Sequence, residues 1–397
     1  MKKCELLSPA GSIQRLEWAF LYGADAVYMG GYKYNLRANA KNFSMEELKQ
    51  GCLIAKAKKK KVYVTVNFIF HNDDIDGLVL YLKELENIGV DAIIISDLFI
   101  LKLLKENSIN LPVHVSTQLS TLNSEAIKFL ADEGVERVIL GRELTLDELK
   151  DIVKNTKVQI ETFIHGATCS GYSGRCVLSN YLTNRDANRG GCSQVCRFDF
   201  DIYDDNKIVN DKKFTCATKD LSLITRISDM IKLGITSFKI EGRMRSNYYI
   251  ATVVSTYRQV IDDYYNNTLT EDKINEYKLI LDRCANRDSS EHFIKGYVDE
   301  TDQYYNARSE ITNQDFLGIV IKYDEYNKKV YISQRNCFKK GDEVVLFGPN
   351  HKKISLVIPS IYNDKGQEVD IANHPEEIIN FTLKEKVNKN DIMRVKF

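Results

Sequence analysis

Four cysteines gather in one short stretch of the chain. They follow the spacing C-x6-C-x15-C-x3-C, and they are Cys169, Cys176, Cys192 and Cys196. An even spread of the nine cysteines over 397 residues would place fewer than one in such a window. The stretch is also rich in glycine and serine, which let the backbone approach a compact object. Four converging thiolates in a reducing compartment bind zinc or an iron–sulfur cluster, so the spacing predicts a metal centre.

The spacing also separates three interpretations of this cluster. Structural zinc usually takes pairs spaced C-x2–4-C, and only Cys192 and Cys196 fit that pattern. Iron–sulfur clusters accept irregular spacing, so the pattern favours an iron–sulfur cluster over zinc and over buried thiols without metal. The segment lacks the C-x3-C-x2-C run of radical enzymes that use adenosylmethionine. Cys216 is an alternative fourth ligand in place of Cys196.

A short recurring phrase indicates the elements that must position these cysteines. Each copy has a glycine suited to the end of a helix, then a small polar pair, then an apolar strand. Each copy follows a helical pattern, and the glycines are Gly23, Gly89, Gly134 and Gly234. Repeated helix–glycine–strand units are typical of a parallel sheet with helical crossovers.

Eight strands of this kind are expected before residue 265. They lie near residues 4–8, 26–30, 62–69, 91–97, 112–117, 136–141, 158–164 and 236–241. Their number and spacing predict an α/β fold of the TIM type, a (β/α)8 barrel, and no glycine-rich phosphate motif supports a doubly wound sheet. The cysteines fall in a long insertion after the seventh strand, over residues 165–220. Because loops that follow barrel strands lie on the catalytic face, we expect the metal centre at the barrel mouth.

Changes in the residue pattern divide the chain into three parts. Residues 1–265 are the expected barrel with its cysteine-rich insertion, and residues 266–315 form a polar, partly helical connector. Residues 316–397 contain short alternating strands separated by turns such as Lys340-Gly341-Asp342. That pattern predicts a small C-terminal β-barrel.

The overall composition is that of an ordinary globular protein. Hydrophobic residues make up 44% and charged residues 28% of the chain, which excludes a disordered chain, a collagen-like fibre and a membrane bundle. Asp97 and Lys102 interrupt the longest apolar stretch, and no signal-peptide core follows Met1. We therefore expect a cytoplasmic protein without membrane contact. Basic and acidic residues are equal at 55 each, so nucleic acid would have to bind a local basic patch.

Motifs around the cysteines resemble those of a known family. The three most specific are Glu161-Thr-Phe-Ile-His-Gly-Ala-Thr-Cys169, Gly174-Arg-Cys176-Val-Leu-Ser179 and Asn188-Arg-Gly-Gly-Cys192-Ser-Gln-Val-Cys196-Arg197. Supporting motifs are Leu7-Ser-Pro-Ala-Gly11, His114-Val-Ser-Thr-Gln118 and Lys239-Ile-Glu-Gly-Arg-Met-Arg245. On these motifs the chain resembles the collagenase-like peptidase family of unknown catalytic type, from residue 4 to residue 260 and again in the C-terminal domain.

The resemblance implies nucleic-acid or quinone chemistry. The better-understood members carry a 4Fe–4S cluster and hydroxylate their substrates without dioxygen. The branch that this chain resembles most forms 5-hydroxyuridine at the wobble position of tRNA and depends on prephenate, which makes tRNA and prephenate the implied partners. That branch corresponds to a ligand set of Cys169, Cys176, Cys192 and Cys196, whereas another branch keeps Cys216 as the fourth ligand. The resemblance leaves room for a related second subunit.

Three kinds of function stay open at this point. The first is an iron–sulfur hydroxylase that acts on tRNA, on ribosomal RNA or on another aromatic substrate. The second is a collagenase-like peptidase, although the chain has neither a His-Glu-x-x-His zinc site nor a Gly-x-Ser-x-Gly elbow, and a thiolate bound to metal cannot also attack a peptide. The third is a non-catalytic RNA-binding protein with a structural cluster.

Polar residues near the ends of the expected strands are candidates to face the mouth. The expected acid and base groups are Glu161, His165 and Glu241. Arginine binds carboxylates with two parallel hydrogen bonds, and the expected clamps for the two carboxylates of prephenate are Arg37, Arg142 and Arg243. The other expected substrate contacts are Asn67, Ser116 and Gln118. The structural alternative for Glu161 and Glu241 is an ion pair with Lys239 or Arg243, and His165 has a buried structural role as its alternative.

Overall fold

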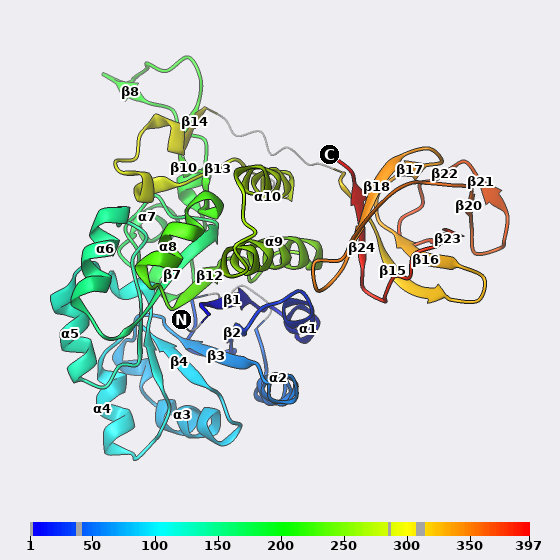
Figure 1. Ribbon diagram of the computed structural model, residues 1–397. Coiled ribbons are helices and arrows are strands. Elements are labelled where there is room, and N and C mark those ends of the chain that lie inside the picture. Colours follow the sequence, from blue (N-terminus) through cyan, green and yellow to red (C-terminus); the bar gives the residue numbers. More distant parts are fainter. Residues whose placement is uncertain (1–2, 37–41, 285–286, 307–313) are drawn as a thin grey trace.

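Eight parallel strands close into a barrel, as the sequence predicts (Figure 1). The computed structural model describes residues 3–36, 42–284, 287–306 and 314–397. The strands are β1 (Glu5–Pro9), β2 (Ala26–Gly30), β3 (Lys61–Val66), β4 (Ala92–Ile95), β5 (Val113–Val115), β6 (Arg137–Ile139), β7 (Gln159–Gly166) and β12 (Ser237–Ile240). They pair in this order, and β12 pairs with both β7 and β1, which closes the barrel.

Helices between the strands cover the outside of the barrel. They are α1 (Ile13–Leu21), α2 (Met45–Ala57), α3 (Leu78–Asn87), α4 (Phe99–Glu106), α5 (Ser124–Asp132), α6 (Leu146–Asn155), α8 (Ile227–Leu233) and α9 (Asn247–Tyr265). Capping boxes begin α2 at Ser44 and α6 at Thr145, where side chain and backbone exchange hydrogen bonds. The four glycines of the recurring phrase all have positive φ, which confirms that they end helices. No helix among the described residues is both long and apolar enough to span a membrane.

A second domain of antiparallel strands follows the barrel. Its sheet runs in the order β19-β18-β24-β15-β16-β23-β20-β21. The strands are β15 (Phe316–Asp324), β16 (Lys329–Gln334), β18 (Glu343–Phe347), β19 (Lys353–Val357), β20 (Ile361–Tyr362), β21 (Glu368–Val369), β23 (Ile378–Thr382) and β24 (Ile392–Val395), with a separate pair β17 (Phe338–Lys339) and β22 (Ile371–Ala372). No pairing between described residues joins β19 to β21, so the expected small β-barrel is a half-barrel around its own hydrophobic core.

The two domains pack against each other through α1 and α9. Figure 1 shows α9 and α10 (Glu271–Cys284) between the barrel and the C-terminal sheet. Tyr248 of α9 stacks on Phe316 with ring centroids 4.7 Å apart. The Tyr22 hydroxyl after α1 donates to the Asn390 carbonyl at 2.7 Å, and its ring meets Phe347 edge-on. Because α9 is covered on two sides, it is buried along most of its length.

The cysteine-rich insertion has its own short elements. They are α7 (Leu178–Thr183), the 3-10 turns η3 (Ala187–Arg189) and η4 (Val195–Arg197), the hairpin β8 (Tyr203–Asp204) and β9 (Lys207–Ile208), and the strands β10 (Phe214–Thr218) and β11 (Asp220–Ser222). β11 pairs with the end of β7, and β10 pairs with β14 (Gln303–Asn306). β13 (Ser289–Ser290) pairs with β11 as well. Part of the segment that the sequence describes as a connector therefore extends the sheets of the barrel and the insertion.

Candidate active site

Buried charged side chains form a network of ion pairs inside the barrel. The Arg137 guanidinium donates to Glu5 at 2.6 Å and to Glu161 at 2.9 Å, and Lys239 Nζ lies 3.0 Å from the other Glu161 oxygen. Burial opposes ionisation of Glu161, but Lys239 and Arg137 outweigh it and bring the pKa of this carboxyl to about 2. The register pairs Glu161 with Ser237, the first residue of β12, which places it deep in the barrel. Glu161 therefore lies inside the barrel, in the ion pair with Lys239 that is the structural alternative for this residue.

His165 belongs to β7, and its side chain contacts α9. Its Nδ1 is 3.3 Å from the Tyr257 hydroxyl, and its ring also meets the Tyr249 ring, both from α9. The pairing of β7 with β12 shifts register between Lys239 and Ile240, and such a bulge changes the side to which a side chain points. Burial lowers the pKa of His165 to about 3, so its imidazole is neutral at physiological pH. These contacts correspond to the structural alternative for this residue.

Glu241 follows the last barrel strand, at the mouth. The Tyr28 hydroxyl lies 2.9 Å from Glu241 Oε2, and the Tyr249 hydroxyl donates to the Glu241 carbonyl at 3.0 Å. Its side chain is partly exposed. Among the three expected acid and base groups, Glu241 is the one that follows a strand end and reaches solvent.

The arginines expected to clamp a substrate have different surroundings. Arg243 is buried, and its two terminal nitrogens lie 3.4 Å from Asn35 Oδ1 and 2.6 Å from Asn42 Oδ1. Gly30 makes room for this guanidinium, since a Cβ there would lie 2.5 Å from Arg243 Nη1. Arg142 donates to the Ala167 carbonyl at 2.9 Å, which fixes the first residues of the insertion. Arg37 lies outside the described residues.

The insertion is fastened to the loop that follows β5. Asn67 Nδ2 donates to Ser116 Oγ at 3.2 Å, which brings these two predicted residues together. Gly174 sits directly on Gln118, because a Cβ at Gly174 would lie 1.9 Å from the Gln118 carbonyl oxygen. The backbone N–H of Ser173 also donates to Glu143, after β6, at 2.9 Å. Gln118 therefore lies under the cysteine-bearing loop.

A second set of contacts fastens the insertion to the loop after β3. The Ile69 N–H donates to the Asn188 carbonyl at 3.1 Å, and Arg189 donates to the Ile69 carbonyl at 2.8 Å. Arg189 also forms an ion pair with Asp74. Asn188 Nδ2 donates to the Cys176 carbonyl at 3.0 Å, which ties this contact to a cysteine. Because the loops after β3, β5 and β6 all lie at the carboxyl ends of the strands, the insertion extends across the barrel mouth.

The four cysteines of the pattern lie in this insertion. Cys169 and Cys192 are exposed, and Cys176 and Cys196 are partly buried. Burial raises the pKa of the Cys196 thiol, while Ser170 and Arg197 oppose that rise, and Cys169 and Cys192 are near enough to add to it. The Gln194 N–H donates to Cys192 Sγ at 3.4 Å.

The chemistry of this donor set fits an iron–sulfur cluster. Thiols are the ligands that such clusters take, and Gly171 packs closely against Cys176, where a Cβ would lie 3.5 Å from Cys176 Sγ. Among the described residues no three cysteine, histidine or carboxylate side chains converge closely enough to hold a metal ion, so the loop would have to draw in around the cluster. Cys216 is partly buried on β10, which packs against η4.

Two arginines form ion pairs with one buried carboxylate beside the cysteines, and a third arginine lies near it. Arg245 and Arg287 lie 3.1 and 3.3 Å from the two oxygens of Asp220. Burial lowers the pKa of Arg197, and the nearby Arg287 lowers it further, whereas Asp220 and Cys196 oppose the shift. The sequence interpretation did not select these residues. Two of them could have been found from the sequence, since Arg197 directly follows Cys196 and Arg245 ends a motif after β12. Arg287 lies far from both in the sequence, so no local pattern indicates it.

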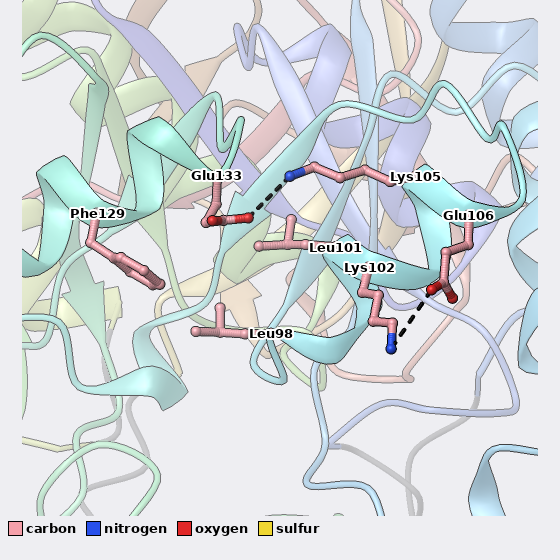
Figure 2. A pocket seen from close by; sticks show the side chains of 7 residues that line it. All are labelled: Leu98, Leu101, Lys102, Lys105, Glu106, Phe129 and Glu133. Carbon is pink, nitrogen blue, oxygen red and sulfur yellow. Dashed lines mark hydrogen bonds and ion pairs between the residues drawn. The ribbon is translucent and has the colours of Figure 1, made fainter.

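A separate pocket of about 430 Å³ lies outside the barrel, between α4 and α5 (Figure 2). Apolar side chains line its base, and its charges are paired, with Lys105 3.0 Å from Glu133 and Lys102 3.7 Å from Glu106. The lining residues are Leu98, Leu101, Lys102, Lys105, Glu106, Phe129 and Glu133. None of the predicted site residues lines this pocket, so it is not the site described above.

Known proteins resemble this chain along nearly its whole length. The model of peptidase family U32 matches residues 11–304, and the model of the peptidase family U32 C-terminal domain matches residues 312–394. A protein from Bacillus subtilis named tRNA hydroxylation protein P1 is 44% identical over 400 residues, which cover 99% of this chain and 95% of that protein.

Two further relatives have different names. A 23S rRNA 5-hydroxycytidine synthase from Escherichia coli is 39% identical over 66% of this chain and 39% of its own length. A protein from Porphyromonas gingivalis named collagenase is 32% identical over 98% of this chain and 96% of its own length. The similar proteins thus include two named for RNA hydroxylation and one named for proteolysis.

Proposed function

This chain belongs to peptidase family U32, and we propose that it is an RNA-modifying hydroxylase acting on tRNA. The observation that carries the proposal is the cysteine-bearing insertion fastened across the barrel mouth, where enzymes of this fold perform their chemistry. The relative named tRNA hydroxylation protein P1, which matches both domains, supports tRNA as the substrate.

The proposed product is 5-hydroxyuridine at the wobble position, formed without dioxygen and in dependence on prephenate. The motifs shared with the tRNA-modifying branch support this finer assignment. For prephenate, Arg197, Arg245 and Arg287 place guanidinium groups near Asp220, beside the cysteines. Arginine binds carboxylates with two parallel hydrogen bonds, which suits a ligand with two carboxylates.

Cys169, Cys176, Cys192 and Cys196 would hold a 4Fe–4S cluster, with Cys216 as the alternative fourth ligand. When bound, such a cluster supplies one-electron redox chemistry. The insertion would exclude water from the mouth, since its contacts with Gln118, Glu143 and Ile69 keep it over the strand ends. Glu241 is the proposed acid–base group, and its hydrogen bond with Tyr28 would orient Oε2 for proton transfer.

Proteolysis is the alternative that the relative named collagenase supports. A cysteine peptidase needs a histidine base beside its thiolate. The two histidines of the barrel strands, His114 and His165, are both buried, and burial lowers the pKa of each to about 3. Because these two histidines are buried, they are poorly placed to act as the base of a cysteine peptidase, which favours the hydroxylase proposal.

The test is the nucleoside content of tRNA from a strain that lacks this protein. We expect 5-hydroxyuridine to be missing, and to return when the full chain is expressed, as measured by liquid chromatography and mass spectrometry. The purified chain should not cleave collagen or gelatin. Unchanged 5-hydroxyuridine in the deletion strain would contradict the tRNA assignment, and metal-independent gelatin cleavage would favour the peptidase.

A further inference from the structure

Helix α7 exposes its apolar residues, whereas its polar residues are buried or partly buried. Leu178, Tyr181 and Leu182 have exposed fractions of 39%, 85% and 55%, and they share one face because they lie three and four residues apart. Ser179 is 1% exposed. This arrangement is the reverse of a helix that packs on a core.

Hydrogen bonds hold α7 in this orientation. Ser179 Oγ accepts from the Ser193 N–H at 3.0 Å, and the Thr183 hydroxyl donates to the Ser179 carbonyl at 2.7 Å. Thr183 Oγ1 also lies 3.0 Å from Ser193 Oγ. The polar face of α7 is thus bonded to the segment that carries Cys192. We call the outward face, with Val177, Leu178, Tyr181 and Leu182, the α7 platform.

Two exposed arginines flank the α7 platform in the sequence. Of the four arginines in residues 167–198, Arg189 is paired with Asp74 and Arg197 lies near Asp220, which leaves Arg175 and Arg185. Arg175 and Arg185 lie on either side of α7 and are exposed. Neither forms an ion pair with a carboxylate in the part of the chain that the structure describes. These two arginines supply local positive charge of the kind that an uncharged protein needs to bind nucleic acid.

We propose that the α7 platform binds the single-stranded RNA next to the nucleotide that enters the barrel mouth. A base stacks on Tyr181, and Arg175 and Arg185 contact the flanking phosphates. The platform begins one residue after Cys176, so RNA held there reaches the site. Chemistry on a base requires an unpaired nucleotide, which is the form that aromatic side chains recognise. This inference rests on the proposed function and adds the surface that holds the substrate.

RNA suits this surface better than a protein partner does. One face of a six-residue helix is far smaller than the roughly 800 Å² per partner of a stable protein interface. Exposed arginines beside a tyrosine are the combination typical of single-strand binding.

The test is RNA binding by the full-length protein, measured by fluorescence anisotropy. One probe is a hairpin with an unpaired uridine in its loop, and the other is a fully paired duplex of equal length. We expect the hairpin to bind more tightly, and Tyr181→Ala to weaken that binding roughly tenfold. Tyr181→Trp should retain it. Tyr326→Ala is the matched control, since Tyr326 is 92% exposed in the turn between β15 and β16, and it should bind as the wild type does.

Two results would overturn the inference. One is equal binding of the hairpin by wild type and Tyr181→Ala, and the other is a photo-crosslinker at position 181 that labels protein and no RNA in cells. The 5-hydroxyuridine content of tRNA is measured separately in the same strains. If wild type restores this nucleoside and Tyr181→Ala binds normally, the inference fails and the proposed function stands; if wild type restores none, the proposed function itself fails.

Discussion

At the scale of single residues, the charged group most deeply placed in the barrel supports the fold. Glu161 has no exposed surface and neutralises part of the charge of Arg137 and Lys239. Removing one member of a buried ion network leaves its partners uncompensated, which costs more than an exposed pair contributes.

We therefore expect Glu161→Gln to lower the free energy of unfolding by about 3 kcal/mol. Urea denaturation followed by circular dichroism measures this change. Glu325→Gln is the control, because Glu325 forms an exposed ion pair with Lys386, and it should shift stability by less than about 0.5 kcal/mol. Equal effects of the two variants would contradict the structural role of Glu161.

Stability should also fall in acid, over two overlapping ranges of pH. The pKa values of His114 and His165 are lowered from 6.5 to about 3 in the folded state, so protonation favours unfolding as the pH falls below 6.5. The pKa of Glu161 is lowered from 4.5 to about 2, so its contribution is present above pH 4.5 and disappears as the pH falls toward 2. In Glu161→Gln the loss below pH 4.5 should become smaller while the loss above it remains. A pH series of urea titrations measures these losses, and an unchanged loss of stability below pH 4.5 in Glu161→Gln would contradict the prediction.

At the scale of elements, the position of the insertion depends on close backbone approach. Gly174 has φ of +75° and touches the Gln118 carbonyl, so a side chain there is strained and also collides. Gly366 has φ of +77° with open space around it, which provides the same backbone strain without a collision.

Gly174→Ala should release the insertion from the barrel mouth, whereas Gly366→Ala should not. Hydrogen exchange of residues 167–219 is the measurement, and we expect faster exchange there in Gly174→Ala than in the wild type and the control. Identical exchange in all three proteins would show that the insertion is held by other contacts.

The elements also show how far the sequence predicts the structure. The barrel was predictable because the helix–glycine–strand phrase is local and repeats. The strands β10, β11, β13 and β14 were not, because they have two to five residues and pair with partners far along the chain. The bulge that turns His165 toward α9 likewise depends on the register of β7 against β12. A one-dimensional pattern also could not distinguish a half-barrel from a closed barrel, since closure depends on the pairing of its end strands.

At the scale of the whole molecule, the half-barrel packs against the barrel through α1 and α9. Tyr22 is central to this contact, since its ring meets Trp18 and Phe347 and its hydroxyl reaches Asn390. Loss of a buried aromatic ring leaves a cavity that the surroundings fill only in part.

We expect Tyr22→Ala to destabilise the protein by about 3 kcal/mol and to uncouple the unfolding of the two domains. Differential scanning calorimetry should show a single transition for the wild type and two for the variant. Tyr326→Ala, which removes an exposed ring from the half-barrel, should keep the single transition. Two transitions already in the wild type would contradict the coupling.

The proposed function depends on a redox cluster that the cysteines across the barrel mouth would hold. The most direct measurement is the iron and sulfide content of anaerobically purified protein, compared among wild type, Cys176→Ala, Cys196→Ala and Cys337→Ala, the last an exposed cysteine outside the insertion. We predict about four iron and four sulfide per chain in wild type and Cys337→Ala, with loss of both in the other two variants. Zinc in place of iron, or no metal in the wild type, would contradict the account.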